Sequence, residues 1–389
     1  MRPDDLDNGE LHGKIGLLIE NLCSIRDETG EYLQHLPDGR IVDTKSWDTD
    51  TWDWTHGIGL YGMWKYFILT RDSTVKERVI SWFEKRFASG VKVDKNINTM
   101  SPFLALACLY DEIPDQRYLP MLEDWAQWAM RDLRRTRYGG MQHDTYQGPN
   151  PGQLWDDTLM MTVLPLTKIA ILLKKPSRIR EAKHQFLLHI KYLFDASTGA
   201  FFHGWTFNGH HNFAQARWAR GNSWLTIVIP DFVELLDDAE SELGGWVSQD
   251  PIRQHLLDTL EAQLDFLASC QDSGRGMWHT LLDHSDEGSY LESSATAGFA
   301  YGTLKAIRLK LCPPSKVETY RAMAEGAVRA TLANIDTNGE LQRTSFGTAM
   351  GDDLDFYRRI PVTSMPYGQA MAIMALGEYL YLPSRDRLA

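Results

Sequence analysis

Cysteine and clustered basic residues are both scarce in this chain of 389 residues. The four cysteines, Cys23, Cys108, Cys270 and Cys312, are far apart and lie in apolar helical contexts. This usage favours buried free thiols in a reducing compartment over disulfides. The net charge is −12 and no stripe of lysine and arginine occurs, which argues against a nucleic-acid partner.

Long apolar runs and a secretion signal are also missing. Residues 1–9 are polar and acidic, without the apolar segment that a signal peptide requires. The longest apolar run, near residues 160–173, contains Lys168 and Pro165 and is too short to span a bilayer. We therefore expect a cytoplasmic protein with no membrane partner. The sequence does not indicate an oligomeric state.

Motifs for phosphate loops, a serine nucleophile and metals are absent as well. The sequence has no G-x-x-x-x-G-K-[ST] or G-x-S-x-G pattern, and its G-x-G-x-x-G match, Gly57 to Gly62, lies inside a predicted helix rather than in a turn between a strand and a helix. It has no H-x-x-x-H or H-E-x-x-H spacing, since His184 and His189 are five residues apart and His210 and His211 are adjacent. We expect neither a metal nor another cofactor.

What the chain does have is helical periodicity nearly throughout, with enough apolar residues, 43%, for a large core. The pattern predicts helices at 10–26, 55–71, 74–89, 98–111, 116–134, 157–174, 177–195, 220–237, 250–270, 292–311, 315–334 and 367–382. One helix of each successive pair follows a long loop rich in glycine, tryptophan, histidine and aspartate, and the other follows a short polar link. This is a degenerate repeat of helical hairpins.

Six hairpins with their long loops on one side predict an all-α protein, a closed (α/α)6 barrel. We expect residues 1–389 to form a single catalytic domain of this kind, with short β-hairpins in the mouth loops. The inner helices are those that begin near 55, 98, 157, 220, 292 and 367. They carry small residues such as Gly62, Gly298 and Ala370 where neighbouring helices must approach. Function is expected in the loops just before them.

Tryptophan is plentiful, at 13 residues, and many of the tryptophans stand beside glycine in loops. An indole face packs well on a sugar ring, although each of these tryptophans could equally serve only to pack its own loop against the protein. The stretch Trp155-Asp156-Asp157 is the most informative. Either aspartate could cap the following helix. Alternatively, Asp157 is a catalytic acid, kept protonated by its apolar surroundings and by Asp156.

Other polar and aromatic residues occupy the same position in the repeat, just before inner helices. Each of them alone could have a purely structural role, in a loop hydrogen bond, an ion pair or packing. A closed barrel, however, would aim all of them into one mouth. The segments are 52–57, 96–99, 139–143, 201–205, 218–224, 276–279 and 290–294.

The chain resembles the unsaturated rhamnogalacturonyl hydrolases of glycoside hydrolase family 105, which are related to the unsaturated glucuronyl hydrolases of family 88. Five matching segments occur in the family's order, across about residues 52–376. They are Gly139-Gly140-Met141-Gln142-His143, Leu154-Trp155-Asp156-Asp157-Thr158-Leu159-Met160-Met161, Phe202-His203-Gly204-Trp205, Trp218-Ala219-Arg220-Gly221-Asn222-Ser223-Trp224 and Ser289-Tyr290-Leu291-Glu292-Ser293-Ser294.

The resemblance implies an (α/α)6 barrel that removes a 4,5-unsaturated uronic acid from the non-reducing end of oligosaccharides left by a polysaccharide lyase. The oligosaccharide is then the small-molecule partner. The sugar is a vinyl ether, so one acid can start the reaction, in contrast to the usual pair of carboxylates. By resemblance, Asp157 is the general acid and base, and His203 places the water or binds a ring hydroxyl.

The resemblance also implies a set of substrate-binding residues. Arg220 would bind the uronate carboxylate, since its fork suits a planar anion. Some family members have aspartate where this chain has Asn98, so that residue would hold a hydroxyl instead. Aromatic and imidazole rings would flank the sugar or line its subsites: Trp54, His143, Trp155, Trp224 and His279.

The sequence is also compatible with two other functions. A sugar 2-epimerase on the same barrel would use a histidine pair, for which His203 and His279 are candidates. A sugar-binding protein without catalysis is the other. The sequence also predicts that Asp156→Asn costs much less activity than Asp157→Asn, because adjacent helical residues point about 100° apart.

Overall fold

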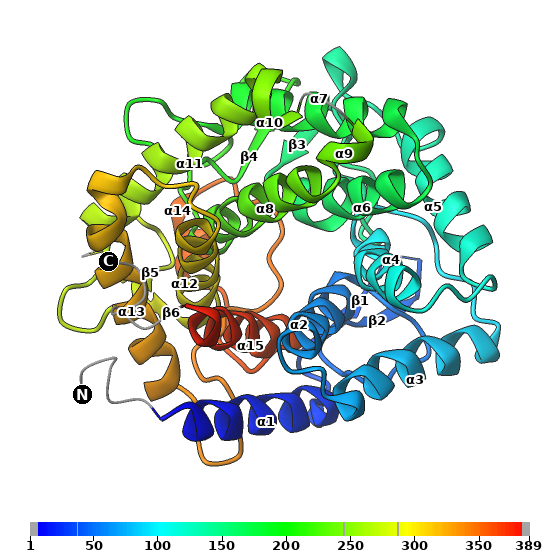
Figure 1. Cartoon of the computed structure of the whole chain (residues 1–389), viewed down its shortest axis with the longest axis horizontal. Helices are drawn as coiled ribbons and strands as arrows, with labels where there is room; N and C mark the ends of the chain where they lie inside the picture. Colours follow the sequence, from blue (N-terminus) through cyan, green and yellow to red (C-terminus); the bar gives the residue numbers. More distant parts are fainter. Residues whose placement is uncertain (1–6, 37, 244–245, 286–287, 383–389) are drawn as a thin grey trace.

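The helices form two concentric rings in the computed structural model, which describes residues 7–36, 38–243, 246–285 and 288–382 (Figure 1). The described part of the chain supplies six inner helices: α2 (Trp54–Thr70), α4 (Pro102–Glu112), α6 (Leu164–Leu172), α8 (Ala219–Asp238), α12 (Ser293–Arg308) and α15 (Pro366–Tyr381). Around them lie α1 (Asn8–Ser24), α3 (Ser73–Ser89), α5 (Leu119–Arg131), α7 (Pro176–Leu193), α11 (Pro251–Cys270) and α13 (Val317–Ala333). The predicted (α/α)6 barrel is confirmed. Residues 1–6 of the acidic N-terminal segment, and both ends of the predicted 1–389 domain, lie outside the described residues.

Two of the predicted inner helices begin differently from the prediction. The helix expected at 98–111 starts as a 3-10 turn, Asn98–Met100, before α4. The helix expected at 157–174 starts as a π-helix, Leu159–Val163, before α6. Pro165 explains this widening, because proline has no N–H to continue an α-helical ladder. Three short helices were not predicted: α9 (Glu240–Leu243), α10 (Trp246–Gln249) and α14 (Leu354–Arg358).

Small residues let the inner helices approach one another, as the sequence predicts. A Cβ on Gly62 of α2 would lie 2.8 Å from the Cβ of Ala370 in α15. A Cβ on Gly298 of α12 would lie 2.9 Å from the Cβ of Ser223 in α8. Real side chains avoid such distances, so larger residues here would push the inner ring apart.

Charged residues are buried at the end of the barrel where the inner helices finish. Asp231 of α8 is 1% exposed and accepts hydrogen bonds from three side chains, Tyr61, Tyr301 and Lys305. The Nζ atom of Lys305 also lies 2.6 Å from Glu234, and that of Lys65 lies 3.5 Å from Asp231. Arg308 binds both Glu234 and Glu378. We call this group of charges the floor cluster; it ties together α2, α8, α12 and α15.

The strands form three short antiparallel pairs, which the sequence predicts only in part. They are β1 (Leu33–His35) with β2 (Ile41–Asp43), β3 (Gln153–Trp155) with β4 (Gly204–Thr206), and β5 (Trp278–His279) with β6 (Leu291–Glu292). In the second pair Trp155 stands opposite Gly204, and the next N–H, that of Asp156, donates to the carbonyl of His203 at 3.0 Å. This pairing joins two loops that are about fifty positions apart.

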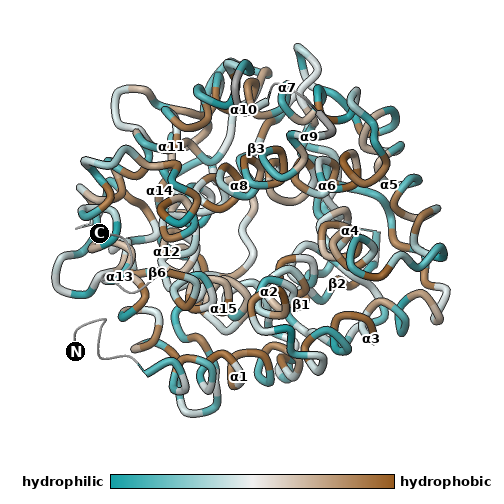
Figure 2. The backbone as a smooth tube through the Cα atoms, viewed as in Figure 1, coloured by the Kyte–Doolittle hydropathy of each residue, from teal (hydrophilic) through white to brown (hydrophobic). Residues whose placement is uncertain are grey.

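The core lies between and within the two rings. Figure 2 shows hydrophobic and hydrophilic residues alternating along the outer helices, as expected for helices with one buried face. In α5, for example, Leu122, Trp125 and Ala129 are buried on one side. Among the described residues, no helix combines the length and the apolar character needed to cross a bilayer.

Candidate active site

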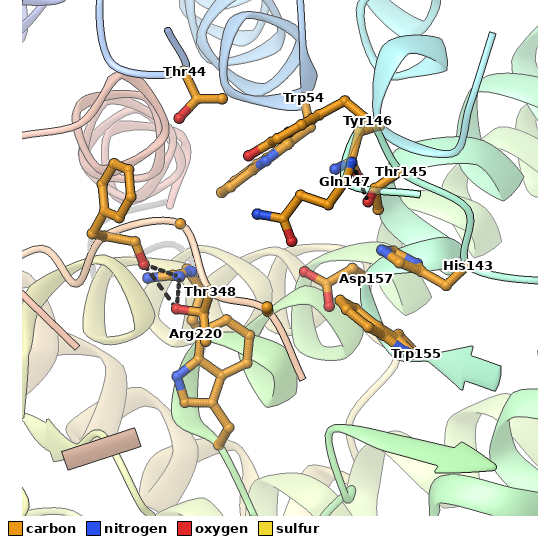
Figure 3. Close-up of a pocket in the computed structure, with 15 residues that line it drawn as sticks. Thr44, Trp54, His143, Thr145, Tyr146, Gln147, Trp155, Asp157, Arg220 and Thr348 are labelled. Atoms are coloured by element: carbon orange, nitrogen blue, oxygen red, sulfur yellow. Dashed lines mark hydrogen bonds between the residues drawn. The ribbon is translucent and has the colours of Figure 1, made fainter. Parts of the chain in front are cut away.

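One cavity opens at the end of the barrel where the inner helices begin. It encloses about 570 Å³, including the part open to solvent. Fifteen residues line it: Thr44, Trp54, Asn98, His143, Thr145, Tyr146, Gln147, Trp155, Asp157, Trp218, Arg220, Phe346, Gly347, Thr348 and Ala349. Six predicted site residues, Trp54, Asn98, His143, Trp155, Asp157 and Arg220, are therefore brought together around it (Figure 3).

The carboxyl group of Asp157 faces this cavity beside the indole of Trp155 (Figure 3). Its side chain is 15% exposed, and its Oδ2 lies 3.4 Å from Nε2 of His203. His203 is 1% exposed and does not line the cavity, so it stands behind the carboxyl group. The predicted contact of His203 with a ring hydroxyl does not fit this position, and a role through Asp157 does.

A hydrogen bond to α14 fixes the orientation of the His203 ring. Its Nδ1 lies 2.7 Å from the hydroxyl of Tyr357 in α14. That hydroxyl also accepts a hydrogen bond from the N–H of Gly351 at 3.2 Å and lies 3.7 Å from Met350 Sδ. The other ring nitrogen, Nε2, faces the carboxyl group of Asp157.

This arrangement reverses the predicted protonation of Asp157. Burial alone would raise the pKa of its carboxyl group, as the sequence suggests. The hydrogen bond and charge of His203, with a smaller contribution from His143, outweigh burial and bring the pKa below its ordinary value. This direction runs against the prediction that apolar surroundings keep Asp157 protonated, because the sequence did not reveal the imidazole behind it.

Asp156 behaves in the opposite way. It is 0% exposed, and burial followed by the nearby charge of Asp157 raises the pKa of its carboxyl group well above the ordinary value. It lies at the end of β3 rather than in a helix, so the expected 100° between adjacent side chains does not apply. One donor atom each of Asp156, Asp157 and His203 lies within 4.8 Å of the others.

His143 and Trp155 form one wall of the cavity. Their rings stack with centroids 4.2 Å apart and an interplanar angle of 11°. His143 Nδ1 shares a hydrogen bond of 2.9 Å with the Thr158 hydroxyl, and burial lowers the pKa of the imidazole to about 3. The stacked pair therefore gives this part of the cavity an aromatic, uncharged lining, which suits a sugar.

The aromatic residues of the other wall differ from the prediction. Trp54 lines the cavity and stacks on Tyr367 with centroids 4.5 Å apart. Trp224, predicted to flank the sugar, is 0% exposed and packs edge-on below Trp54, so this prediction is wrong. Trp218, at the cap of α8, lines the cavity instead. It belongs to the same sequence segment, but its spacing alone did not distinguish it from Trp224.

His279 is also placed away from the cavity. Its Nδ1 lies 2.6 Å from the carbonyl oxygen of Ser289 in the turn that joins β5 to β6. His279 is not among the residues that line the cavity, so the cavity gives no support to its predicted substrate contact. The same placement removes the basis for an epimerase that uses His203 and His279 as an acid and base pair.

Arg220 lines the cavity, but its guanidinium is already engaged. The side chain is 0% exposed. Nη1 donates to the carbonyl and hydroxyl of Ser345, and Nη2 donates to Phe346 O at 2.9 Å and to Thr348 Oγ1 at 3.0 Å. The fork that was expected to grip a carboxylate thus holds the loop 345–348 against α8 and places a positive charge beneath it.

Several lining residues were not singled out by sequence reasoning. Thr145, Tyr146 and Gln147 come from the long loop before β3, and Gln147 extends toward the middle of the cavity (Figure 3). Residues 346–349 come from the loop before α15. Both loops were expected at the mouth, yet no motif marked these positions. Asn98, at the start of its 3-10 turn, is 8% exposed and takes its predicted place on the wall.

This fold and cavity assign the chain to the sugar-cleaving enzymes that are built on a double ring of helices. Residues 24–382 match the model of Glycosyl Hydrolase Family 88, so the chain belongs to that family and is a glycoside hydrolase.

Solved structures and a curated relative agree with this assignment. A possible member of the GH105 family from Salmonella enterica serovar Paratyphi A is 54% identical, with a TM-score of 0.91 over 97% of this chain and 95% of that one. A second possible member, from Klebsiella pneumoniae, is 52% identical, with a TM-score of 0.90 over 97% and 94%. The unsaturated rhamnogalacturonyl hydrolase YesR of Bacillus subtilis is 26% identical over 337 residues, which are 86% of this chain and 91% of YesR. The resemblance to family 105 is thus confirmed.

Proposed function

We propose that this glycoside hydrolase removes a 4-deoxy-4,5-unsaturated uronic acid from the non-reducing end of an oligosaccharide made by a polysaccharide lyase. The uronic acid is unsaturated galacturonic acid linked to rhamnose, or its glucuronyl equivalent. One observation carries this proposal. Among the described residues that line the cavity, Asp157 has the only carboxyl group, and it opens into an aromatic cavity that also has a buried cation, Arg220, on its wall.

The chemistry needs one proton donor and one water. Asp157 delivers a proton to C4 of the vinyl ether, and positive charge develops on C5 and the ring oxygen. The Asp157 carboxylate then takes a proton from water while the oxygen of that water bonds to C5. The resulting hemiketal opens, and the glycosidic bond breaks downstream. Proton transfer by a positioned side chain typically accelerates a reaction by about 10²–10⁴-fold.

The uronate carboxylate requires positive potential and hydrogen-bond donors. Within the described residues, the backbone N–H groups of Gly347, Thr348 and Ala349 donate to no acceptor. All three residues line the cavity, and Arg220 holds their loop from below. We assign the carboxylate to these amides, with Arg220 supplying charge rather than the direct bidentate contact expected from its fork.

The walls supply the remaining contacts. Four rings that line the cavity, those of Trp54, His143, Trp155 and Trp218, offer aromatic contacts to the sugar. Asn98 and Gln147 offer amide groups for ring hydroxyls. The reaction belongs in the cytoplasm, since Cys23, Cys108, Cys270 and Cys312 are all free thiols.

The test follows the near-ultraviolet absorbance of the C4=C5 bond. Wild-type protein should abolish it on lyase-generated disaccharides, and a panel of galacturonyl-rhamnose, glucuronyl-rhamnose and glucuronyl-galactose substrates identifies the preferred one. Asp157→Asn should lose at least about 10³-fold in kcat while still binding substrate. Asp258→Asn, an exposed change on the outer helix α11, is the matched control and should keep full activity. Full activity of Asp157→Asn would refute the proposal.

A further inference from the structure

We propose that Asp156 is a second functional carboxyl group, which stores the proton that Asp157 delivers to the substrate. This inference rests on the proposed function, because it explains how an enzyme with an ionised Asp157 obtains its acid. Sequence reasoning gave Asp156 a capping role or an influence on the protonation of Asp157, but no part in delivering the proton.

The position of Asp156 is unusual for an acidic residue. Its carboxyl group is fully buried, and neither oxygen accepts a hydrogen bond from any donor in the described part of the chain. Helix α8 passes so close that a Cβ on Gly221 would collide with this carboxyl group. An ionised carboxylate without donors in such a place is costly, whereas a protonated carboxyl group is much less so.

A protonated Asp156 has one suitable acceptor at hand, the carboxylate of Asp157. Donor atoms of the two residues and of His203 lie within 4.8 Å of one another. Two acidic groups this close do not both ionise readily, so the pair holds one proton between them. A hydrogen bond between the two carboxyl groups exists only while that proton is present.

The surrounding charges decide which member holds the proton. Asp156 faces the anion of Asp157, the cation Arg220 on α8 and the hydroxyl of Tyr357 on α14. Burial and Asp157 raise the pKa of Asp156 more than Arg220 lowers it. Asp157 has His203 at 3.4 Å, and its pKa is lowered. In the free enzyme the proton therefore resides on Asp156.

Substrate binding then reverses this preference. A uronate carboxylate brings negative charge into the cavity, and the sugar displaces water from the exposed edge of Asp157. Both changes favour a neutral Asp157. The proton moves from the Asp156 carboxyl to the Asp157 carboxylate and from there to C4. Asp157 next accepts a proton from the attacking water, and that proton returns to Asp156 when product leaves. No proton is gained or lost by the pair over the cycle.

The experiment compares pH profiles of kcat/KM for wild-type protein, Asp156→Asn and the surface control Asp258→Asn. In Asp156→Asn the store is gone, and Asp157 titrates alone with its low pKa. We expect activity at pH 7 to fall about 10²-fold or more, and to recover as the pH is lowered toward the limit of stability. A merely structural role of Asp156 would lower activity at every pH without recovery on acidification. A wild-type profile, or a loss that is uniform with pH, would overturn the inference.

Two further measurements keep the outcome decisive. If Asp156→Asn does not fold, infrared spectra of wild-type protein with labelled aspartate should show the carbonyl band of a protonated carboxyl group at pH 7; its absence overturns the inference.

Loss of activity with a chelator, restored by a divalent cation, would mean that the three side chains bind metal and would also overturn the inference. An inactive Asp157→Asn with an unaltered Asp156→Asn profile refutes only the proton store. An active Asp157→Asn refutes the proposed function itself.

Discussion

Replacing Lys305 by methionine tests whether the floor cluster holds the barrel together. The Nζ atom of Lys305 is completely buried and binds both Asp231 and Glu234. Removing one partner of a buried ion pair typically costs about 3–5 kcal/mol. Asp231 keeps two tyrosine hydroxyls, at 2.8 and 3.0 Å, and Lys65 at 3.5 Å, so we expect the lower end, about 3 kcal/mol.

This loss converts into a modest change in melting temperature. With about 2.1 cal/mol/K of unfolding entropy per residue, a chain of 389 residues has about 0.8 kcal/mol/K, so 3 kcal/mol corresponds to about 4 °C. Scanning calorimetry and urea unfolding measure it. The matched control is Lys316→Met, which also removes a lysine between two carboxylates, Glu261 and Asp265, but in a side chain that is 34% exposed. An exposed pair contributes about 0–1 kcal/mol.

The pH dependence of the two proteins should differ in a defined direction. In the folded protein the pKa of Asp231 and that of Glu234 are both lowered; burial opposes this, but Lys305 and Lys65 outweigh it. Carboxyl groups of this kind stabilise the fold above their unfolded pKa of about 4, and the stabilisation is lost as the pH falls through the folded values. Lys305→Met lacks part of this contribution, so the difference from wild type should shrink on acidification. If Lys305→Met is no less stable than Lys316→Met at pH 7, the floor cluster does not stabilise the barrel.

Two other variants test the cavity. Arg220→Lys keeps the charge but replaces two donor nitrogens with one, so loop 345–348 loosens; we expect KM to rise about 10-fold or more with a smaller change in kcat, measured by initial rates of absorbance loss. An unchanged KM would show that the loop does not contribute to binding. Gly221→Ala places a Cβ against the Asp156 carboxyl group and should cost about 1–3 kcal/mol of stability together with activity. Urea unfolding and the same rate assay check it, and a fully stable, active variant would contradict the close contact.

The double ring was predictable because it depends on local pattern. Hydrophobic spacing, loop length and small residues such as Gly62 are all read within one helix or loop, and the structure bears them out. The π-helix Leu159–Val163 was missed because periodicity does not distinguish it from an α-helix. The proline that explains it was visible, but its effect depends on what the surrounding helices allow.

The chemical states of the site were less predictable, since they depend on pairs that are distant in sequence. The pKa of Asp157 is set by His203, which the pairing of β3 with β4 brings behind it. Arg220 is engaged by a loop about 125 positions further along the chain. The order of segments does not reveal either contact. Trp224 was predicted and Trp218 was missed, because both belong to one segment and only packing separates them.

The loop before α15 has a further consequence for anyone who redesigns this enzyme. Its first part, residues 346–349, forms a cavity wall, and its later part, α14, supplies the Tyr357 hydroxyl that orients the imidazole of His203. Exchanging the whole loop for that of a relative would therefore alter reactivity along with substrate preference. Selectivity is easier to engineer at positions 145–147, which lie across the opening and share no hydrogen bond with Asp157 or His203 among the described residues.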